Sequence, residues 1–473
     1  MLTLAKKALR ATAWGGLRAL TRANAFSVLV PLYERAIQQI DANGRLSPPR
    51  PTLRGEFTIL VLSAEQYRKD PQILAGQPGI RVLVLEQRWQ MRLLFQFFEQ
   101  GHLWEKYMNP PPGSDLERQK ASYRRFLGVF LPRLYERLSI DCLVSPHVHY
   151  YSDADIGAVS DALGYPYVVL HRENLAITKP VCDMIATRLG RIRSFEGSLI
   201  VVHNDAMRDV MTSAGFVDPE RIKALGCTRM DSFVRSCAAA KPPQNATKRI
   251  LFFPFHTGSW FPEKVRSFFV AVHATLVRYA MARPEVEVLI KPKPKFESTW
   301  RRDFDRAMRE SGLRPETVWN LKIDSGGDAQ ALIFRSDVVT GVQTTTVLEA
   351  GVAGRPVVVP YFRDIEMSEF NDGVMFRSDS SDCFDIAHDP EEYRAMLDKA
   401  LLRPTLAPEK REAVRRVFSR FVSDLEGQAT DKYVRALRAT VSAAAPRRAA
   451  VSERAVKRAS CHASVDGAHD RSQ

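Results

Sequence analysis

Cysteine is scarce in this chain, and its copies are scattered along it. None forms a CxxC pair or has the spacing of a metal site; the six are Cys142, Cys182, Cys227, Cys237, Cys383 and Cys461. Such usage is typical of a reducing cytoplasm and argues against a zinc site. We therefore expect neither a bound metal ion nor a cofactor.

Long hydrophobic runs are missing as well. Residues 1–40 have no long apolar core and no small-residue cleavage site, which predicts neither a secretory signal nor a transmembrane helix. The segment instead has the pattern of a basic amphipathic helix, with apolar positions at Leu2, Leu9, Trp14, Leu17 and Leu20. Such a helix can lie in a membrane interface. A basic surface helix packed on its own domain is the alternative.

The net charge of +14 raises the question of a nucleic-acid partner, but no aromatic-plus-basic RNA motif, zinc finger or helix-turn-helix signal accompanies it. Much of the charge lies at the two ends, in Lys6, Lys7, Arg10, Arg18 and Arg22 and in Arg447, Arg448, Arg454, Lys457, Arg458 and Arg471. Basic termini more often contact lipids or stay solvated. We expect no nucleic acid and a cytoplasmic location, with peripheral contact to the inner face of the cytoplasmic membrane as a hypothesis.

What the chain does contain is an alternation of strand and helix patterns. Its 473 residues exceed what one core usually serves, so two domains are expected. Buried-strand patterns at 57–63, 80–86, 141–147 and 199–203 alternate with helical ones, and the rhythm restarts at 249–255 after a linker-like segment. The predicted fold class is α/β, with two doubly wound Rossmann-like domains facing across a cleft.

The predicted organisation has four parts. Residues 1–50 form a basic amphipathic helical segment and linker, and 51–236 form an N-terminal Rossmann-like domain. Residues 249–440 form a C-terminal Rossmann-like domain. Residues 443–473, basic and rich in Ala and Ser, are predicted to be a disordered tail.

The most informative stretch runs from Ser336 to Tyr361. It has the pattern of a strand, a turn at Thr344, Thr345 and Thr346, a short helix ending at Gly354, and a second strand. Hydroxyls and free N–H groups at the mouth of a helix suit a phosphate. Glu349 follows where a carboxylate can accept hydrogen bonds from both ribose hydroxyls. The alternative is that the threonines only cap the helix and Glu349 is solvated.

At this point the chain resembles a family. Its T-x-x-LEA-x-x-x-G-x-PVVVP segment, the GCTRMD segment at 226–231 and the two-domain order resemble the GT-B glycosyltransferases. Bacterial enzymes of capsule and lipopolysaccharide assembly are the most similar branch, including relatives of the CDP-glycerol glycerophosphotransferases. The resemblance implies transfer of a sugar or alditol phosphate from a nucleotide donor to a surface glycan or lipid-linked acceptor. The segment at 426–437 resembles the family's closing helix only weakly, because Glu426 and Tyr433 replace its Asp and Arg.

The resemblance and the strand ends together suggest donor-binding residues. Lys291 and Lys293 follow one predicted strand of the second domain, where a parallel sheet places ligand groups, and His256 and Thr257 follow another. All four are candidates for contacting the donor phosphates. The alternatives are lysines that flank a surface turn and a structural histidine.

An acid/base group is expected in the first domain, since inverting transfer needs a group that deprotonates the acceptor hydroxyl. One predicted strand end supplies His171 and Glu173, which we favour. Another supplies His147 and His149, followed by Asp153 and Asp155 as alternative bases. Asp155 could equally cap the helix beside it.

Two other functions remain open. HREN at 171–174 and DSGG at 324–327 resemble motifs of non-hydrolysing UDP-N-acetylglucosamine 2-epimerases. Their order and spacing depart from that family, in which HRREN begins the second domain and DSGG runs directly into the nucleotide helix. A catalytically inactive, membrane-associated scaffold of the same fold is the non-enzymatic alternative.

Overall fold

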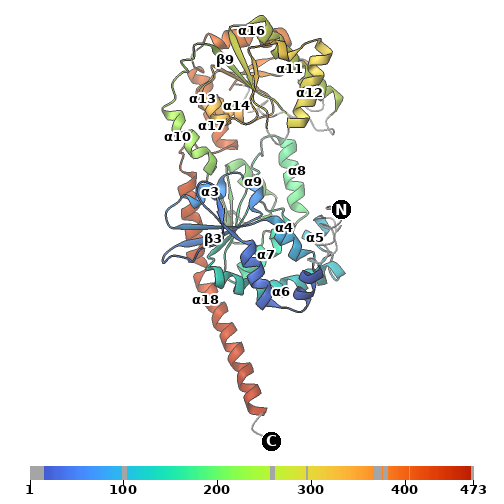
Figure 1. The fold of residues 1–473 in the computed structure, drawn as a ribbon, viewed down its shortest axis with the longest axis vertical. Coiled ribbons are helices and arrows are strands. Elements are labelled where there is room, and N and C mark those ends of the chain that lie inside the picture. Colours follow the sequence, from blue (N-terminus) through green and yellow to red (C-terminus); the bar gives the residue numbers. More distant parts are fainter. Residues whose placement is uncertain are drawn as a thin grey trace.

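The computed structural model describes residues 15–98, 104–255, 262–293, 297–366, 375, 382–403 and 405–469. Two lobes lie one above the other, each built around its own sheet, and the last helix returns from the upper lobe to run along the lower one (Figure 1). The predicted fold class, α/β with two doubly wound domains, is confirmed.

The first sheet has the order β2-β1-β4-β3-β5-β6-β7-β8. Strands β3 to β8 are parallel. The apolar strands β3 and β4 are buried along their whole length, as expected for parallel strands that are covered on both faces. The strands are β1 (Gln38–Ile40), β2 (Leu46–Ser47), β3 (Phe57–Leu62), β4 (Ile80–Leu85), β5 (Cys142–Ser145), β6 (Tyr167–Leu170), β7 (Leu199–Val202) and β8 (Ile222–Ala224).

Helices cover both faces of this sheet. Side chains of α2, α6, α7 and α9 pack in one core with one set of strand residues, and α3 and α18 pack with the alternate set. The helices are α2 (Phe26–Ala36), α3 (Asp70–Ala75), α4 (Gln87–Leu94), α5 (Trp104–Met108), α6 (Asp115–Leu138), α7 (Tyr151–Ala162), α8 (Lys179–Gly190) and α9 (Asp205–Ser213), with 3₁₀ turns η1 (Ala64–Gln66), η2 (Pro219–Arg221) and η3 (Thr228–Met230).

The second sheet is parallel throughout its described strands and has the order β11-β10-β9-β12-β13-β14. Counted along the chain this is 3-2-1-4-5-6, the order of dinucleotide-binding sheets, with its switch point between β9 and β12. The strands are β9 (Lys248–Phe253), β10 (Val286–Ile290), β11 (Leu321–Ile323), β12 (Val338–Gly341), β13 (Val357–Pro360) and β14 (Asp385–Ala387).

Helices also cover both faces of the second sheet. One core contains side chains of α11, α12 and α16, and the other contains those of α10, α13, α14 and α17. Their bounds are α10 (Asp231–Ala238), α11 (Glu263–Ala282), α12 (Glu297–Ser311), α13 (Ala329–Phe334), α14 (Thr346–Val352), α15 (Arg363–Glu366), α16 (Pro390–Leu401) and α17 (Pro408–Phe421), with a 3₁₀ turn η5 (Pro315–Thr317).

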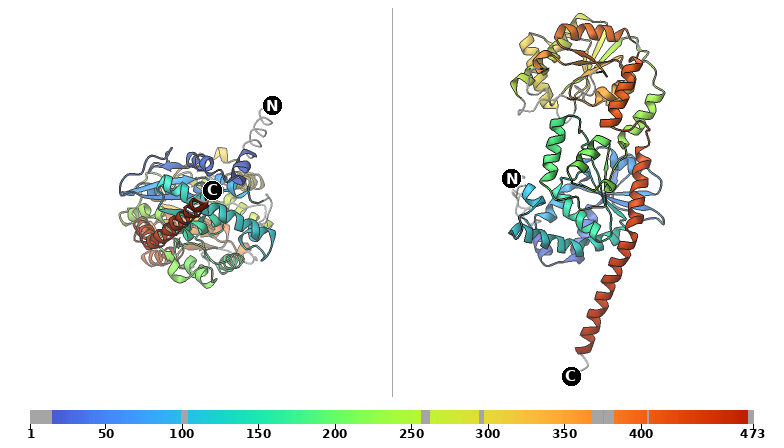
Figure 2. Two further views of the ribbon diagram at one scale, coloured as in Figure 1. Left: turned by 90° about the horizontal axis from the view of Figure 1, so that it is seen from below. Right: turned by 180° about the vertical axis from the view of Figure 1, so that it is seen from behind.

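Three predicted boundaries differ from the structure. Strands β1 and β2 belong to the first sheet, although 1–50 was predicted to be only a helix and a linker. Helix α18 (Ala429–His469) packs Ala429, Tyr433 and Leu437 on the first sheet, although residues up to 440 were assigned to the second domain. The same helix continues through most of the segment predicted to be disordered, and it projects beyond the lower lobe (Figure 2). Its alanine content favours helix whatever its charge.

The described part of the N-terminal helix packs on the first domain. Residues 15–22 are helical, and Leu17 is buried in the core that also contains Leu29 and Tyr33. Leu2, Leu9 and Trp14 lie outside the described residues. Within the described ranges, no helix is both long enough and apolar enough to cross a membrane.

The chain crosses between the domains twice, at 226–231 and at 421–430, and the two crossings are bound to each other. The Asp231 carboxylate accepts hydrogen bonds from the N–H groups of Ala429 (2.9 Å) and Thr430 (2.8 Å) and from the Thr430 hydroxyl (2.6 Å). It thereby caps α18 from the start of α10. Gly226 adopts φ +84°, and a Cβ there would lie 2.7 Å from an Asp424 carboxylate oxygen, so the first crossing needs glycine.

We predict that Asp231→Ala lowers the free energy of unfolding by about 2 to 3 kcal/mol, because it leaves buried donors at the start of α18 without an acceptor. Asp389→Ala is the matched control, since Asp389 caps α16 through one N–H group, that of Glu392. Its expected loss is about 1 kcal/mol. Urea unfolding of the three proteins measures both. Equal losses would show that Asp231 does not hold the crossings together.

Candidate active site

Polar side chains gather at one edge of each sheet, where the parallel strands end. In the first sheet, the segment Ser63–Asp70 follows β3, His147 follows β5, and His171 and Glu173 follow β6. In the second sheet, Lys291 and Lys293 follow β10, and the threonine turn follows β12. Ligands of open α/β sheets bind outside these carboxyl ends, at the switch point of strand order.

The threonine turn lies at the switch point of the second sheet. Gln343 adopts a left-handed φ of +56° and turns the chain from β12 toward α14. The Thr344 and Thr346 hydroxyls are 2.8 Å apart, and Thr345, the residue that precedes α14, makes no side-chain cap hydrogen bond. The threonine before the helix therefore does not cap it, and the Thr344 hydroxyl instead accepts the Thr346 N–H at 3.4 Å. His256 and Thr257, predicted to follow the first strand of the second domain, lie outside the described residues.

Glu349 is buried rather than solvated, with 5% of its surface exposed. Its Oε2 accepts a hydrogen bond from Gln330 Nε2 at 3.1 Å. Burial raises the pKa of this carboxyl to about 7, against the opposing effects of the Gln330 hydrogen bond and of the positive Arg229 and Arg68. Both arginines belong to the first domain or to the first crossing. A carboxyl of the second domain therefore lies within electrostatic reach of the first.

The two predicted lysines differ in their contacts. Lys291 is buried, and its ammonium group donates to the backbone oxygens of Ser325 (2.9 Å) and Pro292 (3.2 Å). This geometry supports the loop after β11, and the buried Lys291 does not flank a surface turn as the alternative supposed. Lys293 is exposed; partial loss of solvent and the nearby positive Arg68 lower its pKa. Of the two, Lys293 is the one placed to meet a ligand.

Glu173 is oriented by a histidine of the neighbouring strand end. Its Oε2 lies 3.2 Å from His147 Nε2, while His147 Nδ1 accepts the backbone N–H of His149 at 3.0 Å. Because Nδ1 is the acceptor, the hydrogen of neutral His147 must be on Nε2 and points at Glu173. This hydrogen bond lowers the pKa of Glu173, whose side chain remains 61% exposed. The result is an ionised, accessible and oriented carboxylate.

The second favoured base, His171, is almost fully buried. Its ring centroid lies 4.4 Å from that of His147, and only 3% of the residue is exposed. Burial, followed by repulsion from His147 and other nearby histidines, lowers the pKa of His171 far below its usual range. A buried imidazole that binds protons so weakly is poorly suited to accept one from a substrate.

Asp153 is part of a buried hydrogen-bond network. Its carboxylate has no exposed surface and accepts hydrogen bonds from the hydroxyls of Ser145 (2.6 Å), Ser63 (2.8 Å) and Ser152 (2.8 Å), and from the amide of Gln90. Burial raises the pKa of Asp153 to about 6. The network joins the ends of β3 and β5 to α4 and α7. It leaves no face of the carboxylate open to an acceptor substrate.

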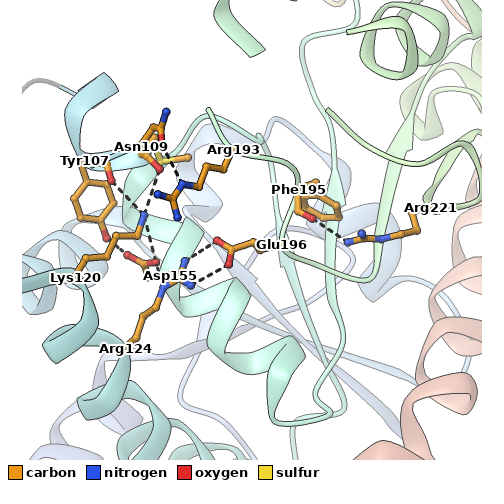
Figure 3. Close-up of polar contacts among 10 residues, drawn as sticks. Tyr107, Asn109, Lys120, Arg124, Asp155, Arg193, Phe195, Glu196 and Arg221 are labelled. Atoms are coloured by element: carbon orange, nitrogen blue, oxygen red, sulfur yellow. Dashed lines mark hydrogen bonds and ion pairs between the residues drawn. The ribbon is translucent and has the colours of Figure 1, made fainter. Parts of the chain in front are cut away.

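The other alternative, Asp155, is also buried, and Figure 3 shows its partners. Arg124 Nε donates to it at 2.6 Å, Lys120 Nζ lies 3.6 Å away, and the Tyr107 hydroxyl donates to it. Arg124 in turn holds Glu196 with two hydrogen bonds. Asp155 thus stabilises the packing of α5, α6 and α7 and is not a candidate base.

Sequence reasoning missed three arginines close to these groups, Arg68, Arg172 and Arg229. Arg172 and Arg229 were inside segments singled out for other reasons, and Arg68 follows a strand that was predicted correctly. The signal that could have identified Arg68 was its position after β3, at the switch point of the first sheet. Among the residues that the structure describes, no three His, Cys, Asp or Glu side chains are placed to hold a metal ion.

Comparison with protein-family models and with curated protein sequences finds no match. Several solved structures are similar in fold. The wall teichoic acid polymerase TagF has a TM-score of 0.46 and 14% identity, over 93% of this chain and 98% of that one. A putative UDP-N-acetylglucosamine 2-epimerase from Listeria monocytogenes has a TM-score of 0.45 and 12% identity, covering 81% and 96%. A UDP-forming α,α-trehalose-phosphate synthase from Burkholderia xenovorans has 0.42 and 11%, covering 81% and 99%.

The raised pKa of Glu349 predicts a pH-dependent stability. Because the folded protein holds this proton up to about pH 7, ionising Glu349 destabilises the fold as pH rises from about 4.5 through 7. Glu349→Gln removes that penalty, so its stability relative to wild type should increase over this range by on the order of 3 kcal/mol. Urea unfolding between pH 5 and 8.5 measures it.

The control for this experiment is Glu412→Gln, on the exposed face of α17. A stability difference between Glu349→Gln and wild type that stays constant with pH would contradict the assignment of a buried Glu349 with a raised pKa.

Proposed function

We propose that the protein is a transferase that moves a sugar or alditol phosphate from a nucleotide-activated donor to a bacterial surface glycan or lipid-linked acceptor. One observation carries the proposal. Glu349 is buried at the switch point of a 3-2-1-4-5-6 sheet, directly after a threonine turn and within reach of arginines from the opposite domain. That is where an open α/β sheet holds a nucleotide.

In this proposal the second domain binds the donor. Ribose hydroxyls donate to the Glu349 carboxylate, and their hydrogen bonds, with the positive Arg229 and Arg68, favour its ionised form. The hydroxyls of Thr345 and Thr346, both partly exposed, contact the phosphates, and the Lys293 ammonium group offsets their charge. Side-chain cations thus take the place of a metal ion at the leaving group.

Glu173 of the first domain is the proposed base. Its exposed carboxylate accepts the proton of the acceptor hydroxyl while the acceptor oxygen forms a bond to the sugar carbon or alditol phosphorus of the donor. The bond between that atom and the departing phosphate oxygen breaks, and the nucleotide leaves with the electron pair. His147 is a positioning residue, since its Nε2–H holds the Glu173 carboxylate.

The alternatives predict different behaviour. An epimerase-like isomerase would convert a nucleotide sugar without an acceptor, and a scaffold would not turn donor over. In the structure HREN follows β6 of the first domain and DSGG follows β11, the edge strand of the second sheet. DSGG leads into α13, whose Gln330 donates to Glu349, and not directly into α14 as in the epimerase pattern, and this departure supports transfer.

A thermal-shift panel of nucleosides, nucleoside diphosphates and nucleotide sugars tests the proposal on wild type and Glu349→Gln. A ligand at about 100 times its dissociation constant adds roughly 2.7 kcal/mol to stability, which is readily seen as a higher melting temperature. We expect one nucleotide series to stabilise wild type and the shift to shrink in the variant. For the donor identified, Glu173→Gln should lower the turnover number about 10²- to 10⁴-fold with donor binding unchanged.

Glu196→Gln is the control for the turnover measurement, because this carboxylate pairs with Arg124 outside the proposed site. Absence of any nucleotide effect at millimolar concentration contradicts the transferase and favours the scaffold. Conversion of a nucleotide sugar at the same rate with and without acceptor supports the isomerase instead.

We also propose that the basic N-terminal helix contacts the membrane surface peripherally. Leu17 faces the core, while Arg18 and Arg22 are exposed. Arginine side chains exposed in this way are attracted to anionic lipids. Charge reversal at both positions should weaken co-sedimentation with anionic vesicles severalfold, and Arg54→Glu, at an exposed site before β3, should not. Equal binding of all variants would contradict this contact.

A further inference from the structure

The segment Ser63–Asp70, which follows β3 at the switch point of the first sheet, is anchored at several points. Ser63 adopts a left-handed φ of +47°, and its hydroxyl donates to the buried Asp153. The Tyr67 hydroxyl donates to the Leu170 carbonyl at 3.2 Å, and Asp70 accepts a hydrogen bond from the Thr228 hydroxyl at 3.0 Å. The backbone that carries Arg68 is therefore held in place from both sides.

Two arginines from other elements contact the same segment. Arg172, after β6, donates from Nη1 to the Gln66 carbonyl. Arg229, in η3 at the first crossing, has its Nε 3.5 Å from an Asp70 oxygen. Arg68 lies between these anchor points in the chain. Arg68 on this loop, and Arg172 and Arg229 from two other elements, thus bring three guanidinium groups to one short segment.

The guanidinium groups around this loop are incompletely paired. Arg68 makes no hydrogen bond or ion pair with any residue that the structure describes, and Asp70 is the single carboxylate paired with Arg229. Burial, and then repulsion from Arg229 and Arg172, lower the pKa of Arg68. The buried Nε of Arg229 also lacks a hydrogen-bond partner. A buried guanidinium nitrogen without a hydrogen bond is costly, and a bound anion would supply the missing acceptor.

The second domain places charged groups near these arginines. Lys293 is near enough to Arg68 for the two to repel, and Glu349 is near both Arg68 and Arg229. Arg68 and Arg229 therefore lie within electrostatic reach of the proposed nucleotide site. Guanidinium groups bind phosphate oxygens in pairs of parallel hydrogen bonds, which makes phosphate the anion that suits a cluster of arginines best.

We propose that Arg68, Arg172 and Arg229 form a phosphate-binding site on the first domain, which holds a phosphate group of one of the two substrates against the second domain. The inference builds on the proposed function, to which it adds an anionic contact on the side of the acceptor. Two sources of the phosphate share this chemistry: the diphosphate of the donor and a phosphate carried by the acceptor.

Isothermal titration calorimetry on the full chain tests the site with inorganic pyrophosphate, with cytidine and uridine diphosphates, and with the corresponding nucleosides. Arg68→Gln should weaken pyrophosphate binding about ten- to hundredfold and leave nucleoside binding unchanged, since one charge-assisted contact is lost. Arg54→Gln is the matched control. Because Arg68 makes no hydrogen bond or ion pair with the described residues, its variant should melt no lower than wild type, so folding does not confound the result.

A second titration separates the two sources. Glycerol 3-phosphate, added with nucleoside diphosphate at saturation, is the probe for an acceptor phosphate. If the donor supplies the phosphate, Arg68→Gln weakens the binding of nucleoside diphosphate. If the acceptor supplies it, nucleoside diphosphate binding is unchanged and glycerol 3-phosphate binding weakens.

The site is overturned if wild type binds no phosphate probe, or if Arg68→Gln binds every phosphate probe as tightly as Arg54→Gln. Nucleotide binding that depends on Glu349 would then still support the transferase. Conversely, pyrophosphate binding that depends on Arg68, with no nucleotide effect of Glu349, supports the arginine site while the proposed function fails.

Discussion

The carboxylate of Asp231 binds the two chain crossings together, and the relation between the domains depends on it. Asp231 is the first residue of α10, where the chain enters the second domain, and its carboxylate caps α18, where the chain returns to the first domain. The Tyr433 hydroxyl, donating to the Gly226 carbonyl at 2.9 Å, adds a second bond between the crossings. Because both connections meet at one buried point, the carboxyl edges of the two sheets are brought to the same region of the molecule.

At that region two glutamates have opposite electrostatic environments. Glu173 is exposed and hydrogen-bonded to His147, which lowers its pKa, whereas burial raises the pKa of Glu349 to about 7. The first is suited to accept a proton and the second to receive hydroxyl donors in a protected place. Arg68 and Arg229 lie close to Glu349, and among the described residues Arg68 has no hydrogen bond or ion pair while Arg229 pairs with Asp70. Incompletely paired charge of this kind is typical of sites that bind a charged ligand.

Much of the fold was predictable because the signals for it are local. Continuous apolar runs predicted β3, β4 and β9, and glycine after an apolar helix predicted the end of α14 at Gly354. The errors concern segments whose state depends on distant partners. Strand β1 is three residues long and exists because it pairs with β4, and α18 packs on the first sheet through contacts with residues more than 300 positions earlier. No local pattern reports such pairings.

The candidate site divides in the same way. The sequence by itself determined the fold class and the placement of Thr344 to Thr346, Glu349, Lys293 and Glu173 at strand ends or just after them, because hydrophobic periodicity and glycine stops are written in neighbouring residues. Only the tertiary structure decided that Asp153 and Asp155 are buried in networks and that Lys291 binds backbone carbonyls. It also decided that His147 orients Glu173. The tertiary structure likewise brings Arg172 and Arg229 to the loop that carries Arg68. Burial and charge pairing are set by residues that lie far apart along the chain, and these properties decide which polar side chains remain available to a substrate.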